Sequence, residues 1–188
     1  MDKELKQGSA FYKNPSFLVK EAIKKVLSHS FTNTNSVDKY IRAKELLTQA
    51  IHLEPKFAAP AFYARAIVML KEGKWASNNE DEIITAQEIA LADLNAATNA
   101  VNNVYSRSIK PVTDYLKQHP YEQNAFLAHK NSAAKEDKNV LKNAFDTKTG
   151  KLIKLKKKIT QIIACIKSKT IYEVELDTDL NMINFMLD

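Results

Sequence analysis

The chain has few of the residues that covalent cross-links and tight turns require. Among its 188 residues there is one cysteine, Cys165, with only three glycines and five prolines. A single cysteine excludes an internal disulfide and favours a reducing compartment. Doubly wound α/β folds and β-sandwiches need many tight turns, and this chain lacks the residues to make them. Helices joined by polar loops therefore suit the composition best.

Long apolar segments are also lacking. No run of apolar residues reaches the roughly 18–20 that a helix needs to cross a bilayer. The first residues, Met1 to Lys6, have no apolar stretch behind a basic patch, so they do not match a secretory signal peptide. Hydrophobic residues nevertheless make up 45% of the chain, which is enough for a folded core. We therefore expect a folded cytoplasmic protein with no transmembrane segment.

The residues that catalysis or metal binding would need are scattered. None of the four histidines pairs with another ligand at helical spacing, and the glycines form no phosphate-binding loop. Asp177 and Asp179 have the spacing that opens a calcium loop, but Met182 stands where the sharp turn needs glycine. Cys165 adjoins the apolar stripe of a predicted helix, which is typical of a packing residue. The sequence thus predicts no catalytic residue, no metal site and no cofactor.

Apolar residues recur at helical spacing in most of the chain. Asn14 followed by Pro15 is typical of a helix cap and the first helical residue. Further apolar stripes predict helices over residues 36–54, 59–72, 83–101 and 152–166. A short helix is expected over residues 104–110, with Pro111 starting or kinking another that runs to Gln118. Gly73 is expected to end the helix of residues 59–72, and Asn102 with Asn103 the helix of residues 83–101. After residue 170 the pattern fits either a short strand or a final helical turn.

Two of the predicted helices repeat one pattern of small and bulky residues: Ala43, Leu47 and Ala50 in one, and Ala90, Leu94 and Ala97 in the other. Alanine lets two helices cross closely, leucine fills the gap between them, and Pro55 turns the chain out of the first helix. The pattern resembles the tetratricopeptide repeat family over about residues 16–103. The two matching helices lie 47 residues apart, whereas the family repeats about every 34. We therefore expect an insertion near residues 76–88.

The resemblance implies a fold and a mode of binding. It implies a single all-α domain, in which antiparallel helix pairs stack as a short array. The helices of residues 104–169 would be diverged repeats or a cap, with a basic capping helix at 151–168. In this family the first helix of each pair lines a concave groove that holds a peptide or a partner's helix. By the resemblance four residues face that groove and bind the partner: Tyr63, Ile67, Leu70 and Lys71. The predicted function is that of a scaffold or adaptor for protein–protein interaction, not that of an enzyme.

The net charge of +6 is unevenly distributed. Residues 135–169 carry eleven lysines against three acids, whereas 170–188 form an acidic tail with five acids and no basic residue. The densest basic patch consists of Lys154, Lys156, Lys157 and Lys158. It supports an alternative function in binding nucleic acid or an anionic surface. A solvated helix face explains the same lysines, because arginines and interleaved aromatics for base contacts are few. An acidic tail lying in the groove would be autoinhibitory.

Overall fold

The computed structural model describes residues 14–27, 36–76, 79–118, 134–168 and 176–187. All regular structure in these ranges is helical, which confirms the all-α class. The elements, in chain order, are α1 (Pro15–Leu27), α2 (Ser36–Leu53), α3 (Ala59–Ala76), α4 (Glu80–Val104), the π-helical turn η2 (Tyr105–Ile109), α5 (Lys110–Gln118), α7 (Ala134–Lys167) and α8 (Leu176–Leu187).

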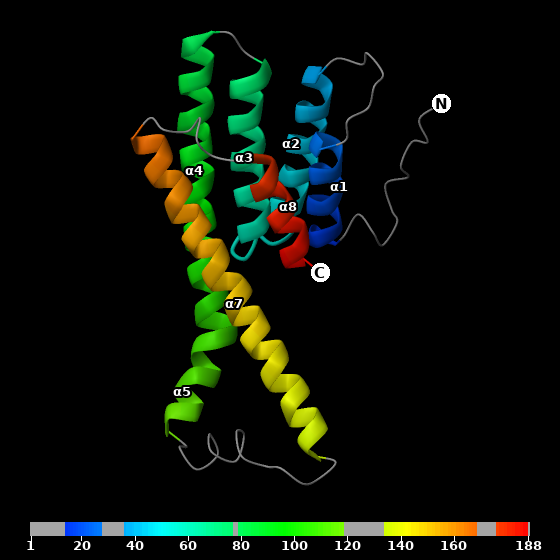
Figure 1. The fold of residues 1–188 in the computed structure, drawn as a ribbon, viewed down its shortest axis with the longest axis vertical. Helices are drawn as coiled ribbons and strands as arrows, with labels where there is room; N and C mark the ends of the chain where they lie inside the picture. Colours follow the sequence, from blue (N-terminus) through cyan, green and yellow to red (C-terminus); the bar gives the residue numbers. More distant parts are fainter. Residues whose placement is uncertain (1–13, 28–35, 77–78, 119–133, 169–175, 188) are drawn as a thin grey trace, which may run out of the picture.

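Helices α1 to α4 pack side by side in chain order (Figure 1). The residues that the sequence pattern placed at helix crossings, Ala43, Ala50, Ala90 and Ala97, are completely buried. Their small side chains allow the backbones to approach closely, while Leu47 and Leu94 fill the core between them. The sequence therefore predicted the helical class and the burial of these residues.

Helix α3 runs past Gly73, so the prediction that it ends there was wrong. A Cβ atom placed on Gly73 would lie 2.9 Å from the Cβ of Ala86 in α4. The glycine therefore lies at a close helix–helix contact. The sequence shows that a glycine interrupts a run of side chains, but it does not show that another helix needs the space.

The prediction that Asn102 and Asn103 end the fourth helix was also wrong. Helix α4 passes directly into η2 and then into α5. The side-chain amide of Asn103 donates to the carbonyl oxygen of Lys56 at 3.0 Å. The Arg107 guanidinium carbon lies 4.7 Å from the centre of the Phe57 ring. Contacts with the α2–α3 turn thus hold a helical segment whose sequence favours a break.

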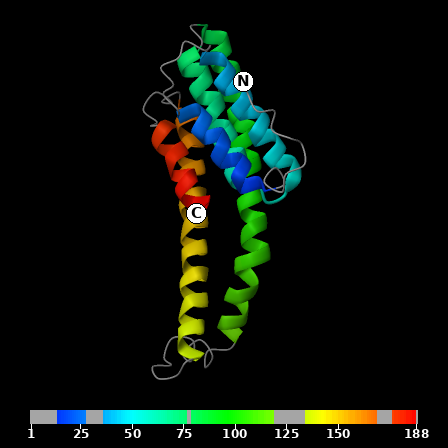
Figure 2. The ribbon, with the colours of Figure 1, turned by 90° about the vertical axis from the view of Figure 1, so that its right-hand side faces the viewer.

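Helix α7 is longer than its apolar pattern predicts, because it begins at residue 134 and not near Leu152. It runs antiparallel to α4 and α5 (Figure 2). Its second half buries Leu155, Ile159 and Ile162 and packs against α4. Its first half and α5 project beyond the layer of α1 to α4 (Figure 1).

The last described helix, α8, lies across α1 and α3 (Figure 1). The sequence left a strand and a helical turn as alternatives for the acidic tail. Residues 176–187 form a helix, and residues 169–175 lie outside the described part of the chain. Helix α8 also reaches α7, because Oδ1 of Asp179 in α8 lies 3.2 Å from the Nζ atom of Lys158 in α7.

Candidate partner-binding face of helices α1 and α3

The four residues predicted to bind a partner share one side of α3. With 3.6 residues per turn, they lie within about 100° of one another around the helix axis. All four are buried: Tyr63 and Ile67 are 0% exposed, Leu70 is 4% and Lys71 is 8% exposed. Their role in binding a partner therefore stays a prediction, and in this conformation other parts of the chain cover them.

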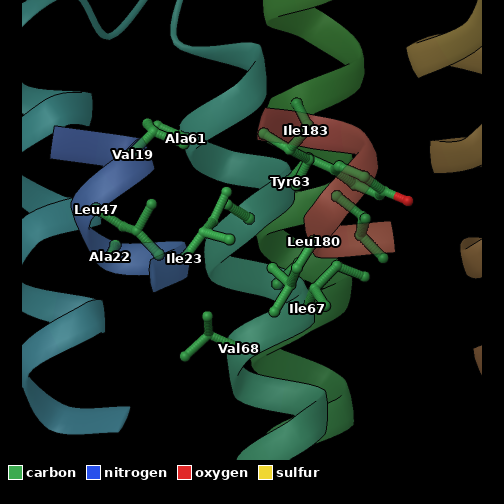
Figure 3. Packing of buried hydrophobic residues seen from close by; sticks show 14 of the residues in the cluster. Val19, Ala22, Ile23, Leu47, Ala61, Tyr63, Ile67, Val68, Leu180 and Ile183 are labelled. Carbon is green, nitrogen blue, oxygen red and sulfur yellow. The ribbon is translucent and has the colours of Figure 1, made fainter. Parts of the chain in front are cut away.

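Helix α8 covers this side of α3. Figure 3 shows Leu180 and Ile183 of α8 beside Tyr63 and Ile67 of α3, with Ile23 of α1 in the same apolar cluster. We call the surface of α1 and α3 beneath α8 the α1/α3 face. All five of these side chains are completely buried, so the face is filled by a helix of the same chain.

The sequence of α8 explains why it adopts a helix on this surface. Its buried residues Leu176, Leu180 and Ile183 lie at positions i, i+4 and i+7, which form one stripe of an α-helix. Asp179 lies near the N-terminus, where a negative charge interacts favourably with the helix dipole. Each fully buried leucine or isoleucine contributes about 1.5–3 kcal/mol, which opposes the entropy lost when the segment becomes ordered.

A polar cluster interrupts the apolar contact of α8. The Oδ1 atom of Asp179 lies 3.2 Å from the Nζ atom of Lys158 in α7, and the Asp179 side chain is only 4% exposed. Burial, and then the negative charge of Asp179, raise the pKa of Tyr63 well above its ordinary value. Oδ1 of Asn184 is buried without a hydrogen-bond partner among the described residues. Buried polar groups left in this state cost about 1–3 kcal/mol each.

The four lysines of the predicted basic patch do not form a single surface. Lys158 reaches Asp179, whereas Lys154, Lys156 and Lys157 are exposed. Among the described residues none of these three forms an ion pair. Lys156 lies about 160° around the helix from Lys154, because neighbouring residues are offset by about 100°. Only Lys154 and Lys157 share the outer side of α7.

A bidentate ion pair that was not anticipated from the sequence joins α3 to α4. The Nε and Nη2 atoms of Arg65 each donate to a carboxylate oxygen of Asp93 at 2.7 Å, and Nη1 donates to Thr48 of α2 at 2.9 Å. Lys44 and Glu72 form a second ion pair between α2 and α3. The hydrogen bonds with Asp93 raise the pKa of Arg65 further. These contacts fix α3, and with it the α1/α3 face, relative to the neighbouring helices.

The described residues contain no group of three histidine, cysteine, aspartate or glutamate side chains that converge as metal ligands. Across the described helices there is no segment with the length and apolar character that crossing a bilayer requires. Comparison of the chain with protein-family models, curated proteins and solved structures gave no match. The function must therefore be inferred from the geometry of the chain itself.

Proposed function

We propose that this protein is a protein–protein interaction module, with α1–α2 and α3–α4 as tetratricopeptide-like helix pairs and α7 as the capping helix. The supporting observation is that the α1/α3 face already holds a helix. In helix-in-groove recognition, an amphipathic helix inserts apolar anchors at i, i+4 and i+7 into a surface. Leu176, Leu180 and Ile183 have that spacing. A partner's helix of the same kind is the ligand that this surface fits, and no catalytic role is proposed.

Affinity capture with a matched pair of variants tests this function. Ile67→Ala removes an anchor of the α1/α3 face, and Leu94→Ala removes a residue of α4; both are completely buried. Truncation of a buried leucine or isoleucine costs about 2–5 kcal/mol at either site. The full chain and Leu94→Ala should therefore retain the same partner, whereas Ile67→Ala should lose it.

The captured partner is identified by mass spectrometry, and its binding is then measured with purified components. Circular dichroism confirms that both variants remain folded. Reproducible failure of the full chain to retain any protein would contradict the proposal. Equal loss of the partner in both variants would also contradict it, because general destabilisation would then explain the result.

A second candidate function is the binding of an anionic polymer or surface through Lys154 and Lys157. The observation in its favour is that both side chains are exposed on the outer side of α7. Substitution of both by glutamine should reduce the salt dependence of binding to labelled single-stranded RNA by roughly 1.4 slope units. Lys56→Gln, at an exposed lysine of the α2–α3 turn, is the control. Absence of RNA binding at low salt would exclude this function for RNA, and anionic vesicles test the membrane form.

A further inference from the structure

The contact between α8 and the α1/α3 face defines the chemistry of the partner. We infer that α8 is a resident substitute for the partner, and that the partner is a short acidic amphipathic helix that displaces it. This inference rests on the proposed function, and it names the partner class and the means of regulation. The pattern expected in the partner is that of Leu176, Asp179, Leu180 and Ile183, with an acid one residue before the central apolar anchor.

The acid in this pattern is required by charge. Asp179 is almost fully buried, and Lys158 lies beside it on a different helix, α7. If a partner's helix replaced α8 without a carboxylate there, Lys158 would lose its counter-charge at the edge of an apolar surface. The apolar anchors therefore set the affinity, and the acid sets the register of the bound helix.

A buried polar group of α8 explains why another helix can replace it. Oδ1 of Asn184 is buried without a suitable hydrogen-bond partner among the described residues. The contacts within α1 to α4 are more complete, because Arg65 makes three hydrogen bonds there. A partner with an apolar residue in place of Asn184 avoids the cost of burying this oxygen. A helix as short as α8 is also barely stable without the surface on which it lies.

The first experiment uses the full chain and a labelled peptide with the sequence of residues 174–188. The receptors are the wild-type chain and the variant Leu180→Ala/Ile183→Ala, which weakens the resident helix. The apparent affinity for the peptide is proportional to the fraction of molecules in which α8 has left the α1/α3 face. This fraction is larger in the variant, so the variant should bind the peptide at least ten-fold more tightly. Fluorescence anisotropy measures the binding, and circular dichroism measures the helical content.

A charge exchange then tests the role of Lys158. Introduced into the weakened variant, Lys158→Asp should lower the affinity for the peptide about ten-fold. A peptide carrying Asp179→Lys should restore it. The matched control is Lys167→Asp, an exposed position of the same helix about 180° around its axis from Lys158, which should leave both affinities unchanged. A purely structural role of Lys158 would not produce rescue by the peptide of opposite charge.

Equal affinity of the wild-type chain and the weakened variant would overturn displacement, and so would absence of peptide binding by a folded weakened variant. If the double variant loses its folding transition, Asp179→Asn in the full chain replaces it as the weakened receptor, with the same expected order of affinities. Failure of these peptide experiments while capture still depends on Ile67 would refute only this inference. Failure of the capture experiment refutes the proposed function itself.

Discussion

Arg65 and Asp93 form the contact through which single residues fix the position of α3. The Asp93 side chain is 8% exposed and accepts two hydrogen bonds from Arg65. Asp93→Asn retains the shape but removes the charge, so it should lower the free energy of unfolding by about 1.5–3 kcal/mol. Urea unfolding measures this loss. Glu45→Gln in the exposed Arg42–Glu45 pair is the control, and it should cost less than about 1 kcal/mol. Equal losses in the two variants would show that burial of the Arg65–Asp93 pair has no special effect.

Tyr63 should make the stability of the protein depend on alkaline pH. Its pKa is raised in the folded state, whereas in the unfolded chain the phenol titrates near 10. The folded protein therefore keeps a proton that the unfolded chain releases. Stability should fall as the pH rises above about 10, by up to about 1.4 kcal/mol per pH unit from this group.

Tyr63→Phe removes this contribution and should flatten the decline. Urea unfolding of both proteins between about pH 8 and about pH 11 checks it. Asp179, which acts on Tyr63 from α8, and Lys158, which pairs with Asp179 from α7, are present in both proteins. The difference between the two curves therefore isolates the phenol. Parallel curves would contradict the prediction.

At the level of single residues, the sequence predicts small side chains better than it predicts polar partners. The buried alanines follow from helical periodicity alone. Arg65 and Asp93 are 28 residues apart, so only the packing of α3 on α4 brings them together. Ile41 and Leu46 are both apolar residues of α2, but Ile41 is 45% exposed whereas Leu46 is buried. Which edge of an apolar stripe is buried depends on the positions of the neighbouring helices. The apolar period of one helix carries no information about those positions.

Among the elements, the contact between α3 and α4 at Gly73 gives a clear test. Alanine is a better helix former than glycine by about 1 kcal/mol. At Gly73, however, the new Cβ would lie 2.9 Å from the Cβ of Ala86. Neither atom can rotate away, so the two helices must separate, at a cost of about 1–3 kcal/mol. Gly73→Ala should therefore lower the melting temperature.

Gly150 provides the matched control, because it lies within α7 with no atom within 4 Å of the position of a Cβ. Gly150→Ala should raise stability by about 0.5–1 kcal/mol through helix propensity alone. Thermal unfolding of the two variants should thus give shifts of opposite sign. Stabilisation by Gly73→Ala would show that α3 and α4 tolerate a wider separation.

The sequence predicts helix boundaries that local residues set better than boundaries that depend on contacts with other helices. The start of α1 is confirmed, since Oδ1 of Asn14 accepts a hydrogen bond from the backbone N–H of Ser16 at 2.9 Å. This cap is local and visible in the sequence. The continuation of α3 past Gly73 and of α4 past Asn103 depends on contacts with other helices. The early start of α7 was missed because residues 134–151 show no regular apolar period.

For the whole molecule, the attachment of α8 predicts a hierarchy of stability. Helix α8 packs mainly against one side of α1 and α3, while α3 contacts helices on several sides. The backbone amides of α8 should therefore exchange with solvent through an opening of lower free energy than the amides of α3. Native-state hydrogen exchange measures both.

Leu180→Ala should accelerate exchange in α8 much more than in α3. The matched change is Leu94→Ala in α4, which should accelerate exchange in α3 as well, because α3 and α4 pack together. Identical opening free energies for α3 and α8 in the wild-type chain would mean that the molecule unfolds as one unit. Displacement of α8 alone would then have no thermodynamic basis.

For the candidate site, the sequence suggested the acidic tail as an occupant of the groove from its charge alone, without the contacts that would place it there. Tyr63 and Ile67 were placed on one side of α3 by the family resemblance, and the structure shows that side against α8. The acidic tail was recognised from its charge, but its buried contact through Leu180 was not. An apolar stripe on a short segment does not identify the surface that it meets, so this part of the site required the fold.

The covalent link between α8 and the face that it covers sets the concentration that a partner needs to displace α8. A segment tethered to its own binding surface acts at an effective concentration on the order of millimolar. A free helix of equal intrinsic affinity would have to reach a similar concentration to occupy the face half of the time. A partner present at low concentration, with an affinity for the face equal to that of α8, would not bind. A partner that binds the face more strongly than α8, or that another contact already holds nearby, would displace α8.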